Sequence, residues 1–178
     1  AASVDAWIGA PDIAEAATRV PVTLTAGSGN GVANRTALVN AVNAAQPGDI
    51  LELPAGTFEV DISSGSISLP RSIDIVGAGQ TATVLDVLPK APATALTPLF
   101  DVATSAPDGS AFLLQDLTVQ GPTTGVNAGS SCAIRWSRSG SVGRLRVERI
   151  TVTGLFDSGV QRSGKGRFEI IDCDLNAY

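Results

Sequence analysis

A repeated arrangement of short apolar segments constrains the fold of this chain more than any other feature of its sequence. Four stretches share the order apolar-x-apolar, short turn, apolar-x-apolar and small residue, and they span residues 67–77, 112–121, 145–154 and 168–177. Equivalent positions in their second halves are Ile73, Leu117, Ile150 and Cys173, and the intervals between them shorten along the chain. A half-unit at 51–53 precedes Ile73. The interval between them is close to the shortest interval between the four equivalent positions. This recurrence predicts a spiral with a basic coil of about 22 residues and loop insertions in two coils.

Each coil of such a spiral can bury its apolar side only against its neighbours. The coils are therefore expected to stack in parallel and in register, with strands about 4.8 Å apart. Under this prediction one interior file contains the four equivalent positions Ile73, Leu117, Ile150 and Cys173.

One convincing helical pattern precedes the repeats. Asn34 or Thr36 can cap it, and Pro47 with Gly48 ends it. Its apolar stripe recurs at helical spacing at Leu38, Ala41, Val42 and Ala45. Because an open spiral end exposes unpaired backbone and core, we expect this helix to cover the first coil. The predicted fold is all-β: a right-handed single-stranded parallel β-helix with an N-terminal capping α-helix at about residues 34–45.

The chain divides by pattern into two parts. Residues 1–33 are predicted to form an N-terminal arm, a short edge strand around Val20 and a Gly-rich loop. Residues 34–178 are predicted to form the capping helix and the coils, with the last coil incomplete at its C-terminal side. We therefore expect a continuation of the natural chain, or a partner subunit in a homo-oligomer, to cover that side.

Charge and composition exclude several classes of function. A net charge of -5 and a pI near 4.6 argue against binding along a nucleic-acid backbone. No apolar run approaches the length of a membrane span, about 18 residues. The sequence contains no His, which excludes a Ser-His-Asp triad within this chain. For the two cysteines, a buried free thiol at Cys173 is favoured over a Cys132–Cys173 disulfide.

Two stretches resemble a known family. Residues 47–58 (PGDILELPAGTF) and residues 75–79 (IVGAG), followed by TVLDV at 83–87, are similar to the opening coils of the pectate-lyase-like right-handed parallel β-helix superfamily. The resemblance covers residues 34–87 well, and from 110 to 178 it persists only as coil periodicity. It implies a fold shared by polysaccharide lyases, glycoside hydrolases, phage tail spikes and adhesins. The matched residues are structural, so the resemblance transfers no catalytic residue.

The resemblance also implies where such a protein acts. It points to an extracellular, cell-surface or virion-surface location and to a polysaccharide or cell-surface glycan as partner. Ca²⁺ is a cofactor that the resemblance alone suggests, since the residues themselves indicate no cofactor and no metal-ligand set.

Outward positions of successive coils are expected to form ladders of polar residues. One predicted ladder contains Asp74, Thr118, Thr151 and Asp174, a second contains Ser72, Asp116, Arg149 and Asp172, and a third pairs Arg146 with Glu169. In the functional interpretation, Asp172 and Asp174 with Arg149 form an acid/base site, since glycoside hydrolysis uses two carboxylates. In the alternative, the charges alternate in sign because stacked like charges repel each other.

Four further residues are candidates for substrate binding. Asp157, Arg162 and Lys165 lie in a polar, Gly-rich loop that could form one wall of a sugar groove or a solvated connection. Trp136 could stack on a sugar ring, or belong to the core because it alternates with Ile134.

The resulting hypothesis is an extracellular or particle-surface β-helix domain that binds a polysaccharide and, if it is an enzyme, cleaves it as a lyase or glycoside hydrolase. The alternative is a non-catalytic structural or adhesive protein, such as a virion spike or decoration component. An enzyme with the predicted site would lose turnover in Asp172→Asn or Asp174→Asn, whereas a structural protein would be unaffected.

Overall fold

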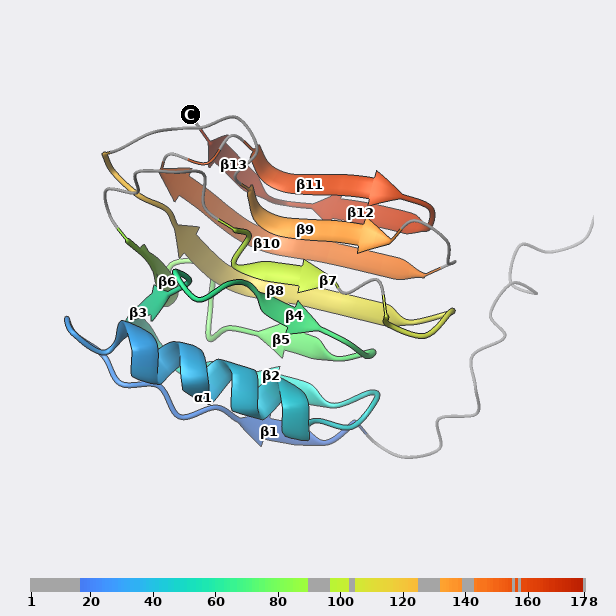
Figure 1. Cartoon of the computed structure of the whole chain (residues 1–178), viewed down its shortest axis with the longest axis horizontal. Coiled ribbons are helices and arrows are strands. Elements are labelled where there is room, and N and C mark those ends of the chain that lie inside the picture. Colours follow the sequence, from blue (N-terminus) through green and yellow to red (C-terminus); the bar gives the residue numbers. More distant parts are fainter. Residues whose placement is uncertain are drawn as a thin grey trace, which may run out of the picture.

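The computed structural model describes residues 17–89, 97–102, 105–124, 132–138, 143–154, 156 and 158–177. These residues form one helix, α1 (Gly31–Ala44), and thirteen strands, all paired in parallel (Figure 1). The strands are β1 (Arg19–Pro21), β2 (Ile50–Glu52), β3 (Gly56–Asp61), β4 (Ile67–Leu69), β5 (Asp74–Val76), β6 (Thr83–Leu88), β7 (Phe100–Val102), β8 (Ala111–Gln120), β9 (Cys132–Arg138), β10 (Arg144–Gly154), β11 (Ser158–Gly164), β12 (Arg167–Ile171) and β13 (Asp174–Ala177). No helix in the described part of the chain is long and apolar enough to cross a membrane.

The chain visits three rows of strands in turn, which we call faces 1, 2 and 3. Face 1 contains β1, β2, β5, the first halves of β8 and β10, and β12; face 2 contains β3, β6, the second halves of β8 and β10, and β13. Together they form a nine-stranded sheet, and face 3 is the four-stranded sheet β4–β7–β9–β11. Figure 1 shows the coils stacked from β1 and α1 at one end to β11, β12 and β13 at the other. This mostly-β, parallel arrangement is consistent with the predicted parallel β-helix.

The corner between faces 1 and 2 is made by non-glycine residues with left-handed backbone geometry. Asp116, Arg149 and Asp172 have φ values of 57°, 49° and 50° and occupy the same corner of successive coils. These three members of the second predicted ladder are confirmed as equivalent positions. Ser72 lies elsewhere, because its Oγ accepts a hydrogen bond from the Ala111 N–H at 3.1 Å, at the start of face 1.

The predicted interior file is correct for Leu117, Ile150 and Cys173, which occupy equivalent positions, and wrong for Ile73. Leu117 pairs with Ile150, and Cys173 precedes Asp174, the register partner of Thr151. Ile73, however, precedes Asp74, whose partner is Leu113. Ile73 therefore lies beside Phe112 on face 1, one face away from Leu117.

The same shift corrects the first predicted ladder. On face 2 the partner of Thr118 is Val84, so Asp74 does not belong to the row of Thr118, Thr151 and Asp174. The segment 67–69 is β4 on face 3, where it pairs with β7. Equivalent positions on face 1 are unevenly spaced along the chain, at Leu51, Ile75, Leu114, Val147 and Ile170.

Helix α1 covers the β1 end of the stack, as predicted, but begins at Gly31 rather than Asn34. It packs on β3 and β4, with Leu38 and Val42 in the core. Asn30 precedes its first turn and makes no side-chain cap. Thr36 does not cap the helix either, because its hydroxyl donates to the Val32 carbonyl at 2.9 Å within it.

Asn34 has a different role from the predicted cap. Its side chain is buried, with 2% exposed. The amide oxygen accepts the Thr25 N–H at 2.8 Å, and the amide nitrogen donates to the carbonyls of Thr25 at 2.9 Å and Glu59 at 3.0 Å. Asn34 therefore ties the Gly-rich loop, the helix and β3 together.

The interior is mainly aliphatic with a few aromatic side chains, and it is well covered except at the β12–β13 end. Val147 is fully buried, whereas its register partner Ile170 is 48% exposed at an equivalent inward position. Cys173 and Leu175 are only partly buried at the same end. Cys132 and Cys173 form no disulfide with each other, so the disulfide alternative is wrong.

Candidate functional site

The outer surface of face 1 carries two open depressions that follow one another across the strands. The first, of about 420 Å³, includes Gln115 and Glu148 in its lining, and the second, of about 390 Å³, includes Glu52 and Val76. These residues belong to one outward file, because Glu52 pairs with Val76, Val76 with Gln115 and Gln115 with Glu148. The two depressions therefore lie along the stacking direction of the coils, and we call them together the face 1 groove.

The first depression combines an apolar floor with polar edges. Asp74, Leu113 and Arg146 form one outward file on β5, β8 and β10. Leu113 lies in the middle of this file, so its side chain separates the carboxyl group from the guanidinium group. The full lining is Asp74, Ala111, Phe112, Leu113, Gln115, Arg144, Arg146 and Glu148.

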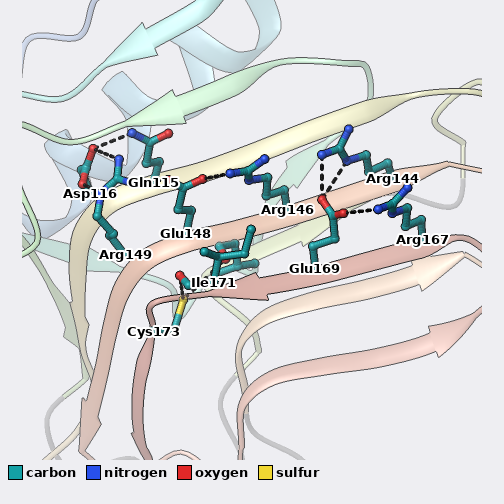
Figure 2. A network of polar contacts seen from close by, with 11 residues as sticks. Gln115, Asp116, Arg144, Arg146, Glu148, Arg149, Arg167, Glu169, Ile171 and Cys173 are labelled. Carbon is teal, nitrogen blue, oxygen red and sulfur yellow. Dashed lines mark hydrogen bonds and ion pairs between the residues drawn. The ribbon is translucent and has the colours of Figure 1, made fainter. Parts of the chain in front are cut away.

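Ion pairs connect the charged side chains beside the groove (Figure 2). Arg149 donates to both carboxylate oxygens of Asp116, at 2.6 and 2.9 Å, and also pairs with Glu148. Glu148 pairs with Arg146 as well. A second group links β10 to β12, where Glu169 accepts a hydrogen bond from Arg144 at 2.7 Å and pairs with Arg167 at 2.7 Å (Figure 2).

These contacts shift the protonation equilibria in opposite directions. The hydrogen bond from Arg149 lowers the pKa of the Asp116 carboxyl, and the hydrogen bond from Arg144 lowers the pKa of Glu169. The same contact with Asp116 raises the pKa of Arg149. Asp74 behaves differently, because burial raises its pKa and a hydrogen bond from the Leu113 backbone only partly offsets that effect. Burial therefore favours the protonated form of Asp74 more than it would be favoured in a solvent-exposed aspartate.

The lowered pKa values predict acid-labile folding. A carboxyl whose folded pKa lies below its unfolded value stabilises the fold above the unfolded value, 3.8 for Asp116 and 4.5 for Glu169, and this stabilisation is lost as the pH falls through the folded value. The free energy of unfolding should therefore decrease below about pH 5. The double variant Asp116→Asn, Glu169→Gln should show a shallower decrease in urea unfolding between about pH 6 and 3. An unchanged slope would contradict the assignment.

Of the predicted acid/base site, Arg149 and Asp172 occupy the same corner of successive coils, and Asp174 follows on face 2. Arg149 is engaged with Asp116 and Glu148. Asp172 is exposed at the corner, and Asp174 is exposed on face 2, where it accepts a hydrogen bond from Asn176. The Arg149–Asp116 pair is what the charge-alternation alternative expects. The third predicted pair is confirmed as a register pair, Arg146 with Glu169. The catalytic role of Asp172 and Asp174 stays a prediction.

Trp136 belongs to the core, which corrects its assignment as a sugar platform. Its side chain is 1% exposed and its ring meets Phe112 edge-on at 6.2 Å between centroids. The indole N–H donates to the Lys165 carbonyl at 3.0 Å. The ring has no free face for stacking, because it lies inside the coil.

Two further predicted binding residues, Arg162 and Lys165, lie away from the face 1 groove. Arg162 and Lys165 are exposed at the end of β11 and the turn into β12, where Arg162 donates to the Gly166 carbonyl at 2.9 Å. Asp157 lies outside the described residues. A binding role for these residues stays a prediction.

The sequence prediction included Arg146 in a ladder but missed most of the residues that line the first depression. Asp74 was assigned to the wrong ladder, and Glu148, Arg144 and Gln115 were not selected. The alternation Arg144, Arg146, Glu148 along one strand was a usable signal, because alternate residues of a strand share a face. Within the described ranges, no group of three or more Asp, Glu or Cys side chains could hold a metal ion, and Ca²⁺ as a cofactor stays a prediction.

Comparison with known proteins supports the fold. No protein-family model matches the sequence, and no curated protein matches it. A solved structure, the PL6 family alginate lyase AlyGC, is similar with a TM-score of 0.54 and 18% sequence identity over 87% of this chain. The match covers 20% of that structure, so the chain spans about a fifth of its length. At this identity the likeness shows the fold alone: a polysaccharide lyase and this chain share a parallel β architecture.

Proposed function

We propose that this chain is a right-handed parallel β-helix domain that binds a polysaccharide along the face 1 groove, in an extracellular, cell-surface or virion-surface setting. The observation that carries the proposal is the alignment of the two depressions along one file across the coils. The strand spacing of about 4.8 Å is close to the length of one pyranose unit, so successive coils can contact successive sugars of a linear chain. Likeness to a polysaccharide lyase supports the proposal without fixing the sugar.

The groove offers the chemistry that sugars require. Leu113 supplies an apolar surface for a sugar ring, and Gln115, Asp74 and Arg146 supply donors and acceptors for hydroxyl groups. The backbone beneath is held by the parallel ladders of β5, β8 and β10. Such a preformed site loses little conformational entropy on binding.

A bulky residue at the centre of the groove should abolish binding. Gln115→Trp is expected to weaken glycan binding by at least about tenfold, equivalent to about 1.4 kcal/mol, because the indole would fill the junction of the two depressions. The matched control is Thr153→Trp, at a half-buried outward position on face 2. Glycan-array screening followed by calorimetry on the best ligand measures both. Equal binding by the two variants would place the site elsewhere.

A second candidate is the structural or adhesive function. The ion pairs favour this function. The arginines beside the groove are paired with carboxylates of the same chain, and such pairs stabilise a surface rather than bind a ligand. If wild-type protein binds no glycan on the array, the structural function is the better conclusion.

We also propose that polypeptide covers the β12–β13 end, from a partner subunit or a further coil. The exposed inward side chain of Ile170 supports this proposal. Light scattering of the isolated 178-residue chain is expected to show association, and Ile170→Lys should reduce it. A stable monomer at high concentration would contradict the proposal.

A further inference from the structure

Two carboxyl groups, Asp74 and Glu148, line the first depression. Asp74 is on β5 and Glu148 on β10, with β8 between them. In the register, Asp74 pairs with Leu113, which pairs with Arg146 on β10. Glu148 is therefore two strands away from Asp74 and two residues beyond Arg146 along β10. Strands about 4.8 Å apart and a rise of about 3.3 Å per residue place the two Cα atoms roughly 12 Å apart. Side chains that extend into the depression from these positions can contact a sugar from two sides.

The surroundings of the two groups differ. Asp74 is half-buried beside Leu113 and forms no ion pair among the described residues. Its raised pKa agrees with this position. Glu148 is paired with Arg146 and Arg149, which fix its position (Figure 2). Asp74 is thus half-buried without an ion pair in the described part of the chain, whereas Glu148 is held between two arginines, and acid/base hydrolysis uses two carboxyl groups in such different surroundings.

We infer that Asp74 and Glu148 form a two-carboxylate site that hydrolyses a glycosidic bond of the bound glycan, an inference that rests on the proposed function. Asp74 donates its proton to the glycosidic oxygen as the bond from that oxygen to the anomeric carbon breaks. Glu148 accepts a proton from a water molecule, whose oxygen forms the new bond to the anomeric carbon. The products are two sugar chains with hydroxyl ends, and the proton on Glu148 returns to Asp74 through solvent.

The separation of the carboxyl groups predicts the stereochemical result. Retaining hydrolysis requires carboxyl groups about 5–5.5 Å apart, whereas inverting hydrolysis requires about 6.5–9.5 Å to leave room for water. With Cα atoms roughly 12 Å apart, side chains inclined toward each other fall in the wider range. The reaction should therefore invert the anomeric centre.

The residues of the depression favour hydrolysis over β-elimination. Elimination from a uronate needs a base that removes a carbon-bound proton. The eight lining residues include neither Lys nor Tyr, and the two arginines, Arg144 and Arg146, are ion-paired with Glu169 and Glu148. Glu148 can accept such a proton, but elimination also needs a cation to offset the carboxyl group of the uronate, and the ion pairs already engage both arginines.

The charge of the groove indicates the class of glycan. Its lining contains three cations, Arg19, Arg144 and Arg146, and three carboxyl groups, Glu52, Asp74 and Glu148. Arg19 is paired with Glu52, and Arg146 with Glu148. With the cations offset in this way, the groove lacks the excess positive charge that a polyanion would select. The sugars at the cleavage position are therefore uncharged.

The test measures products as well as binding. Purified protein is incubated with the glycans that it binds, and three signals are followed: new reducing ends, ultraviolet absorbance of an unsaturated product, and the anomeric configuration of the first product by NMR. We expect reducing ends with inverted configuration and no unsaturated product. Asp74→Asn and Glu148→Gln should each reduce turnover by at least about 100-fold, as removal of a general acid or base does. Binding should remain within about twofold of wild type.

A matched control and a stability measurement keep the result interpretable. Asp61→Asn makes the same change on face 2, where the side-chain oxygen still accepts the Ser63 N–H, and should leave turnover unchanged. Because burial raises the pKa of Asp74, ionising it opposes folding at neutral pH, so Asp74→Asn should melt no lower than wild type.

Each outcome is decisive. Binding without products, an unsaturated product, or full turnover by Asp74→Asn would overturn the two-carboxylate site and leave the binding function intact. Absence of any glycan binding would overturn the proposed function and this inference with it.

Discussion

Gly77→Ala is expected to destabilise the fold by roughly 3 kcal/mol or more. The added methyl group would overpack against backbone atoms that hydrogen bonds hold in place, and such overpacking costs more than a clash with a flexible side chain. A Cβ at Gly77 would lie 2.2 Å from the carbonyl oxygen of Asp116 and 3.0 Å from the Cβ atoms of Leu117 and Thr83. The Gly77 N–H also donates to the Gln115 carbonyl at 2.9 Å, which holds the two backbones close together. Relief of the clash would therefore require breaking the ladder between β5 and β8.

The control is Gly109→Ala. Gly109 has a φ of +80° and no atom within 4 Å of the added Cβ, so only backbone strain of about 1–2 kcal/mol applies. Urea unfolding followed by circular dichroism compares the variants. If Gly77→Ala costs no more than Gly109→Ala, the close approach at this corner is not as described.

Asn34→Ala should cost about 3 kcal/mol, because each buried polar group left without a partner costs about 1–3 kcal/mol. The substitution leaves the Thr25 N–H, the Thr25 carbonyl and the Glu59 carbonyl without their present partner. The loop before α1 should then separate from β3, and hydrogen exchange at the Thr25 amide should accelerate.

The same substitution at Asn43 in the same helix provides the matched control. Asn43 is exposed, so Asn43→Ala removes no buried contact and should raise stability by a few tenths of a kcal/mol through the higher helix propensity of Ala. Comparable losses at both positions would show that Asn34 acts through the helix alone and would contradict the bridging role.

The stacked parallel strands could be predicted from the sequence because the apolar alternation recurs, but the register of the first repeat could not. Residues 67–77 match the later units in residue type, yet β4 lies on face 3 and β5 on face 1. The second and third units cross the corner between faces 1 and 2 within one continuous strand, at Asp116 and Arg149. Apolar alternation does not distinguish these two corners, because both place the same residue classes inside.

The helix illustrates a similar limit. Its apolar stripe at Leu38 and Val42 predicted the buried face correctly. Asn34 suits an N-cap by residue type, and only the proximity of Thr25 and Glu59 in the folded chain gives it another role. Long-range contacts of this kind have no local signature.

The candidate site depended on the register as well. Asp74 could be identified as outward from alternation alone, but its neighbours follow from pairing with Leu113 and, through it, Arg146. Because the predicted register was wrong at Ile73, the prediction placed Asp74 on another face, and the depression around Asp74 was not predicted. Arg149 and Asp116, by contrast, were correctly expected to be neighbours, because the later coils share one pattern.

The unequal coil lengths show that the residues that connect the strands can vary independently of the residues that pair within them. Face 1 positions recur at uneven intervals along the sequence while the strands stay in register, so coil length varies without a change in strand pairing. Doubling the length of such a connection costs only about 0.6 kcal/mol in closure entropy. Natural variation, or an engineered library, can therefore change the connections between strands and so change the ligand that the protein binds. The strand pairing that specifies the fold stays the same.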